Sequence, residues 1–133
     1  MLKLVIVVAL AGCARPSNQL VAYTPVSGAT AKSKTTAIQQ AVVAITDAGQ
    51  EIASSDGATG IALSKWFVPQ GPGGSDMRYR VRVTVSDENA YLIEALCQKQ
   101  RMTWGEWTGC EGDEAQRPRF VVDLLAQIDA KLR

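Results

Sequence analysis

Apolar and polar residues alternate most regularly along residues 77–85. The odd-numbered positions are apolar or aromatic, whereas the even-numbered positions carry Arg78, Arg80, Arg82 and Thr84. Successive side chains of a β-strand point to opposite faces of its sheet. The pattern therefore predicts a strand with one buried face and one polar face, as in an antiparallel sheet that packs on one side only.

A helical period predicts one helix on each side of this strand. Residues 36–48 carry apolar side chains three and four positions apart, after a threonine at 35 or 36 that can cap the helix and before Gly49. Residues 118–132 repeat this period and begin at Pro118, which suits the first turn of a helix. Each apolar face must be buried in a domain of this size.

Three further segments are candidate strands. Residues 50–55 and 61–68 flank an Asp-Gly turn signal, and the alternation of the second segment slips at Lys65 and Trp66, which indicates a bulge or the end of the strand. Residues 90–100 show no clear period, so strand and helix both remain open. The short turn after residue 85 favours a strand paired with 77–85.

The order helix, three or four antiparallel strands, helix predicts an α+β two-layer sandwich. We expect the N-terminal and C-terminal helices to pack on one face of the sheet. The face that carries the three arginines would then be the open one.

The first thirteen residues have the layout of a secretory signal. Lys3 precedes a short apolar run, which ends in the sequence Leu10-Ala11-Gly12-Cys13. These four residues resemble the lipobox of bacterial lipoproteins. The resemblance implies that residues 1–12 are a signal peptide, that the Cys13 sulfur receives diacylglycerol, and that the new N-terminus is acylated, commonly with palmitate. Two such acyl signals anchor a protein stably without a spanning helix.

The resemblance also implies where the protein resides. In enterobacterial lipoproteins an aspartate after the cysteine favours retention at the inner membrane, and here Ala14 follows Cys13. We therefore expect a lipid anchor in the outer membrane, on its periplasmic face.

Residues 13–34 are mostly small and polar and contain two prolines. They predict a flexible tether between the lipid and a single α+β domain at 35–133. Within the tether, residues 20–23 could instead add a short edge strand or contact a partner.

Lipidation of Cys13 would leave Cys97 and Cys110. In an oxidising compartment two remaining thiols predict a disulfide. A redox or metal-binding pair is the alternative, although the spacing is not Cys-x-x-Cys and the chain has no histidine.

Composition argues against several functions. Of fourteen Lys and Arg residues, Lys3 lies in the signal, so thirteen balance thirteen Asp and Glu residues, which disfavours a nucleic-acid binder. Histidine is the commonest general base and metal ligand, and its absence, together with that of Gly-x-Ser-x-Gly and Ser-x-x-Lys motifs, favours a non-catalytic protein without metal or cofactor.

Two features could serve binding. The arginines at 78, 80 and 82 form either a solvated face paired with neighbouring carboxylates or a docking stripe for an acidic partner, glycan or phosphate group. Trp104 and Trp107, with Trp66, are either a segment clamped onto the core or a platform for a sugar, peptide or protein.

The element order, and the succession of Ala-rich helix, Gly, strand, Gly and strand over 36–67, loosely resemble small helix-grip modules of envelope lipoproteins, including those of outer-membrane assembly machines. The resemblance implies an envelope lipoprotein that contacts an envelope protein or the cell wall. The alternative is a small-ligand or lipid-binding module that uses a groove between the helices and the sheet.

Overall fold

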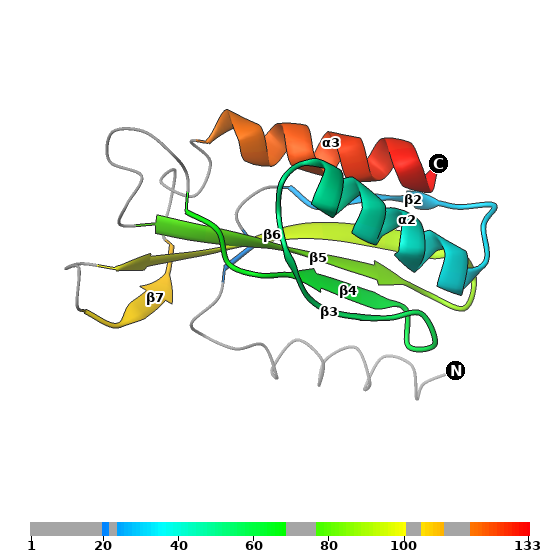
Figure 1. Cartoon of the computed structure of the whole chain (residues 1–133), viewed down its shortest axis with the longest axis horizontal. Helices are drawn as coiled ribbons and strands as arrows, with labels where there is room; N and C mark the ends of the chain where they lie inside the picture. Colours follow the sequence, from blue (N-terminus) through cyan, green and yellow to red (C-terminus); the bar gives the residue numbers. More distant parts are fainter. Residues whose placement is uncertain (1–19, 22–23, 69–76, 101–104, 111–117) are drawn as a thin grey trace, which may run out of the picture.

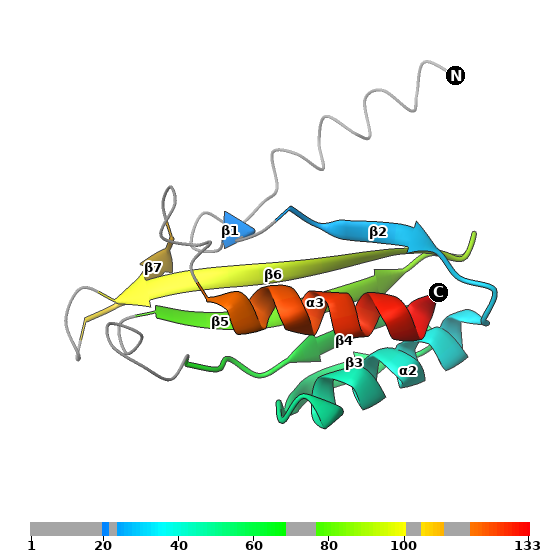
Figure 2. The same ribbon diagram turned by 90° about the horizontal axis from the view of Figure 1, so that it is seen from above.

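Two helices cover one face of an antiparallel β-sheet (Figures 1 and 2). The computed structural model describes residues 20–21, 24–68, 77–100, 105–110 and 118–133. Their elements, in chain order, are β1 (Leu20–Val21), β2 (Val26–Ala29), α2 (Lys34–Asp47), β3 (Ile52–Asp56), β4 (Ile61–Ser64), β5 (Met77–Val85), β6 (Ala90–Gln100), β7 (Trp107–Gly109) and α3 (Arg119–Leu132).

The predicted α+β two-layer sandwich is confirmed, but the sheet is larger than the three or four strands expected. Strands β3, β4, β5 and β6 form the predicted antiparallel meander. The short strands β1, β2 and β7 all pair with β6, which brings the sheet in the described residues to seven strands. They satisfy backbone groups of β6 that would otherwise lack partners.

Strands β5 and β6 form the centre of the sheet. Buried and half-buried residues alternate along all of β5, as the sequence pattern predicts. Residues 90–100 form β6, the strand predicted to pair with β5. Unlike β5, most of β6 is buried on both faces. That burial explains why the sequence of β6 shows no alternation.

The core lies between the sheet and the two helices. Residues with no exposed surface come from both layers, among them Ala37, Ala41, Ile45, Tyr79, Val81, Val83, Ile93, Val121, Ile128 and Leu132. Helix α2 begins slightly earlier than expected, because Ser33 caps it: the Ser33 hydroxyl accepts a hydrogen bond from the Thr36 N–H at 3.2 Å. Gly49 follows the helix with φ of 88°, a conformation that favours glycine.

Strand β4 ends at Ser64, before the position at which the sequence alternation slips. Beyond it, Phe67 makes an isolated bridge to Tyr79, with two backbone hydrogen bonds of 2.8 and 2.9 Å. The chain between them carries Lys65 and Trp66 out of regular pairing with β5. Residues 65–68 are therefore not a continuation of the strand.

The prediction of a flexible tether over 13–34 is wrong where the chain forms strands. The alternative of a short edge strand within residues 20–23 is confirmed by β1 at 20–21, and residues 26–29 form β2, so the folded domain begins before residue 35. In β2, Gly28 lies opposite Tyr91, and a Cβ at Gly28 would meet the Tyr91 hydroxyl at 2.5 Å. The Tyr91 ring thus occupies the space that a larger residue would take. Cys13, the signal segment and residues 14–19 lie outside the described residues.

Within the described ranges, neither helix is long and apolar enough to cross a membrane.

Candidate interaction surface

The face of the sheet opposite α2 and α3 carries a row of alternating indole and guanidinium groups. The guanidinium carbon of Arg78 lies 4.2 Å from the centroid of Trp107 and 4.7 Å from that of Trp66. The guanidinium carbon of Arg80 lies 4.8 Å from Trp66. We call these four side chains, in the contact order Trp107, Arg78, Trp66, Arg80, the arginine–tryptophan row.

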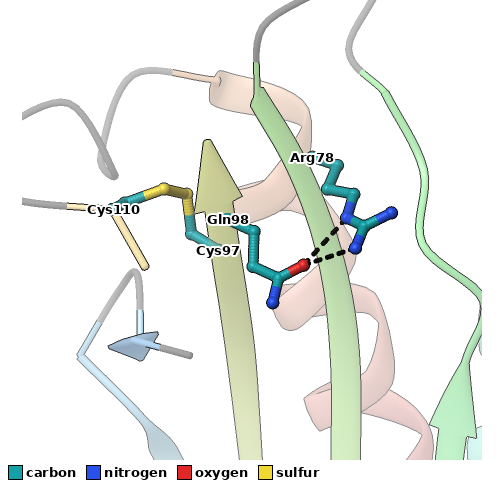
Figure 3. Close-up of a disulfide and its surroundings, with 4 residues drawn as sticks. All are labelled: Arg78, Cys97, Gln98 and Cys110. Carbon is teal, nitrogen blue, oxygen red and sulfur yellow. Dashed lines mark hydrogen bonds between the residues drawn. A yellow bond between two sulfur atoms is a disulfide. The ribbon is translucent and has the colours of Figure 1, made fainter. Parts of the chain in front are cut away.

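Hydrogen bonds hold both guanidinium groups in place, through Nε and Nη2 in Arg78 and through Nε in Arg80. Nε and Nη2 of Arg78 donate to Oε1 of Gln98, its partner on β6, at 2.9 and 2.6 Å (Figure 3). Nε of Arg80 donates to the carbonyl oxygen of Ser64 at 3.1 Å. Ser64 is fixed in turn, because its buried hydroxyl accepts the Val81 N–H at 2.9 Å and donates to the Lys65 carbonyl.

Burial and like charge both act on these groups. Burial lowers the pKa of Arg78 below its ordinary value, and the neighbouring charge of Arg80 lowers it further. The pKa of Arg80 is also lowered by burial. Cation–π contact with the indoles opposes this desolvation and is worth about 0.5–2 kcal/mol per pair.

Arg82 differs from the other two arginines. Its Nε and Nη2 donate to Oε1 of Glu94 at 3.0 and 2.8 Å, and the two residues are register partners across β5 and β6. The Glu94 side chain is only 7% exposed, so its charge depends on this pair. The prediction of a charged face paired with carboxylates is therefore correct for Arg82, whereas Arg78 and Arg80 form no ion pair with another described residue.

The predicted disulfide between Cys97 and Cys110 is confirmed, with Cα atoms 5.6 Å apart. Cys97 lies on β6 and Cys110 directly follows β7, and both are buried. Figure 3 shows Gln98, which faces Arg78, next to this cross-link. The disulfide thus fixes β7, whose first residue is Trp107, beside the arginine on which that indole packs.

The structure brings together three of the five residues predicted to bind a partner: Arg78, Arg80 and Trp107. Trp104 lies outside the described residues. Trp66 was named with the other two tryptophans but not among these five residues, and it contacts both arginines. Gln98 and Ser64, which hold the arginines by hydrogen bonds, were not predicted. The slip in alternation at Lys65 and Trp66 marks the place where the chain leaves regular pairing, but it does not indicate which side chains the Trp66 indole contacts.

Two open depressions border α2. One, of about 440 Å³, lies between α2 and the end of β3 and is lined by Thr35, Ile38, Gln39, Val42, Val43, Ser55 and Gly57. The other, of about 370 Å³, lies between α2 and α3 and is lined by Ala44, Asp47, Gln127, Ala130 and Lys131. Among the described residues, no three Cys, Asp or Glu side chains are arranged to hold a metal ion.

No family model matches the sequence, and no curated protein matches it. Among solved structures, a DUF4468 family protein from Bacteroides ovatus is similar over 81% of this chain and 78% of its own, at 12% identity and a TM-score of 0.43. A TBP-like protein from Parabacteroides distasonis is similar over 82% and 81%, at 13% identity and a TM-score of 0.41. At these values the similarity carries no argument about function.

Proposed function

We propose that this protein is a non-catalytic lipoprotein of the bacterial cell envelope that docks an envelope protein or a cell-wall component on its arginine–tryptophan row. The observation that carries the docking role is the contact of Arg78 with two indoles on the face that neither helix covers. Tryptophan and arginine supply much of the binding energy at protein interfaces. A pre-ordered row loses little side-chain entropy when a partner binds.

The anchoring role depends on Leu10-Ala11-Gly12-Cys13. A lipid on Cys13 would place the domain at the membrane surface, on the periplasmic side of the outer membrane. The disulfide between Cys97 and Cys110 supports an oxidising compartment, where such bonds persist.

Fractionation tests the anchor. The wild-type protein is expected in the membrane fraction and Cys13→Ser in the soluble periplasmic or unprocessed fraction. If Cys13→Ser remains with the membrane as the wild type does, the lipid-anchor proposal is wrong.

Photo-crosslinking in cells tests the docking role. A benzophenone amino acid replaces Lys65, an exposed residue next to Trp66, and the matched control carries it at Arg119, an exposed cation on α3. The proposal predicts a discrete cross-linked species from position 65 that is absent from position 119 and lost when Arg80→Gln is added. Equal products from both positions would contradict docking at the row.

The depression between α2 and β3 favours a second candidate function, the binding of a small apolar ligand or an acyl chain. Its wall includes Ile38, Val42 and Val43, and Val43 is 39% exposed although it is apolar. A fluorescent fatty acid should then bind the wild type and bind Val43→Gln more weakly, with Val122→Gln on α3 as the control. Identical binding to all three proteins would exclude this groove.

A further inference from the structure

The row carries two positive charges that no carboxylate balances within the described part of the chain. The ion pairs there include Arg82 with Glu94, but none involves Arg78 or Arg80. Both side chains are half-buried, and partial desolvation disfavours the charged form of each guanidinium unless an opposite charge lies near it. A bound anion would therefore gain from both charges.

Each of the two guanidinium groups keeps nitrogen atoms that donate no hydrogen bond to another described residue. Arg80 uses only Nε, toward Ser64, and its Nη1 and Nη2 donate to no acceptor among the described residues. The edge formed by Nη1 and Nη2 can bind a carboxylate through two parallel hydrogen bonds. Arg78 uses Nε and Nη2 on Gln98 and keeps Nη1 available.

The spacing of the two arginines restricts which anions can contact both of them. They are two positions apart on β5 and lie on the same face, which places their Cα atoms about 7 Å apart. Carboxylates at alternate positions of an extended peptide share one face at the same spacing. A single phosphate group presents its charge at one point and matches this pattern less well.

We propose that the arginine–tryptophan row recognises an extended acidic segment of a partner protein, with carboxylate side chains at alternate positions. One carboxylate binds the free edge of Arg80 and the other binds Arg78, while the indoles of Trp66 and Trp107 exclude water beside them. This inference rests on the proposed docking function and names the chemistry of the partner.

Titration of the full-length protein, purified in a non-ionic detergent, tests the inference. The probe is a capped five-residue peptide of alternating threonine and aspartate, and the matched control peptide has asparagine in place of aspartate. Binding is followed by tryptophan fluorescence and calorimetry at low ionic strength. The aspartate peptide is expected to bind at least about tenfold more tightly than the asparagine peptide.

Variants locate the binding. Arg80→Gln should weaken binding of the aspartate peptide by about tenfold or more. Arg119→Gln, which removes the same charge from an 87% exposed side chain on α3, should leave binding unchanged. Circular dichroism and the urea midpoint of each variant establish that it is folded.

The inference would be overturned if the aspartate peptide bound no more tightly than about 1 mM, or if both peptides bound with equal affinity. It would also be overturned if Arg80→Gln and Arg119→Gln lost equal affinity for the aspartate peptide, or if inorganic phosphate bound as tightly as that peptide. Binding to phosphatidylglycerol vesicles in preference to the peptide would also overturn it and would favour a lipid headgroup. Cross-linking from Lys65 is independent of this titration. A cross-link without peptide binding would thus reject the acidic segment and keep the docking function.

Discussion

Removal of the disulfide should destabilise the domain strongly and should also loosen the row. Cys97 and Cys110 are 13 residues apart in sequence, and the chain-entropy model gives about 3 kcal/mol of stabilisation for a loop of that size. Both cysteines are buried, so the variant Cys97→Ala/Cys110→Ala avoids placing a hydroxyl in the core. It also loses some packing around the missing sulfur atoms.

Urea unfolding followed by far-UV circular dichroism measures this loss. With a slope of about 1–3 kcal/mol per molar urea, a loss of about 3 kcal/mol lowers the midpoint by about 1–3 M. Reduction of the wild type should lower its midpoint similarly, whereas the variant should not respond to the reductant.

Tryptophan fluorescence under native conditions measures the effect on the row. Without the cross-link, β7 is held mainly by its short pairing with β6, so Trp107 should become more exposed and its emission should shift to longer wavelength. A stability loss under about 1 kcal/mol with unchanged emission would refute the argument that this disulfide positions Trp107.

Three further changes probe the sheet and its two faces. Arg82→Gln removes both hydrogen bonds to the buried Glu94 carboxylate and should lower the free energy of unfolding by about 1–3 kcal/mol. The double variant with Glu94→Gln should recover part of this loss, and an equal loss in the double variant would contradict direct pairing. The pKa of Tyr91 is raised by burial first and then by its hydrogen bond to α3. Its stabilising contribution is therefore complete below the unfolded pKa of about 10 and is lost as pH rises through the folded pKa. Above pH 10, the unfolding free energy of Tyr91→Phe should fall less steeply with pH than that of the wild type. Parallel curves for the two proteins would show that Tyr91 is not the group that causes the loss. Gly28→Ala should displace the Tyr91 ring and cost about 1–3 kcal/mol in urea unfolding, whereas the exposed Ser27→Ala should change little; equal effects would show that the ring yields freely.

The sequence predicts β5, α2 and α3 well because each has one buried face. The alternation of β5 and the helical periods of α2 and α3 reflect this one-sided burial. Strand β6 lacks a period because it is covered on both faces, so only its position after a short turn indicates a strand. Pattern and connectivity thus suffice for the fold class.

Local pattern gives little signal for the short strands: it offers an edge strand at residues 20–23, where β1 forms, only as an alternative, and it does not predict β2 or β7. Strands β1, β2 and β7 have two to four residues each and form because β6 offers backbone groups to pair with. In β2 the sequence Val-Ser-Gly-Ala resembles a linker, and the Tyr91 ring opposite explains the glycine at position 28. Tertiary pairing, not propensity, decides these segments.

The site is partly predictable. The turn between β5 and β6 sets a register in which Arg82 faces Glu94, so this neutral pair could have been found from the sequence. The placement of Trp66 between Arg78 and Arg80 could not, because it depends on how the chain leaves regular pairing after Ser64.

The most direct test of the central proposal is the intact mass of the protein extracted from bacterial membranes. We predict a mass equal to residues 13–133 plus the lipid groups on Cys13, less two hydrogens for the bond between Cys97 and Cys110. An unmodified full-length mass, found in the soluble fraction, would contradict the lipid anchor and the envelope location that depends on it.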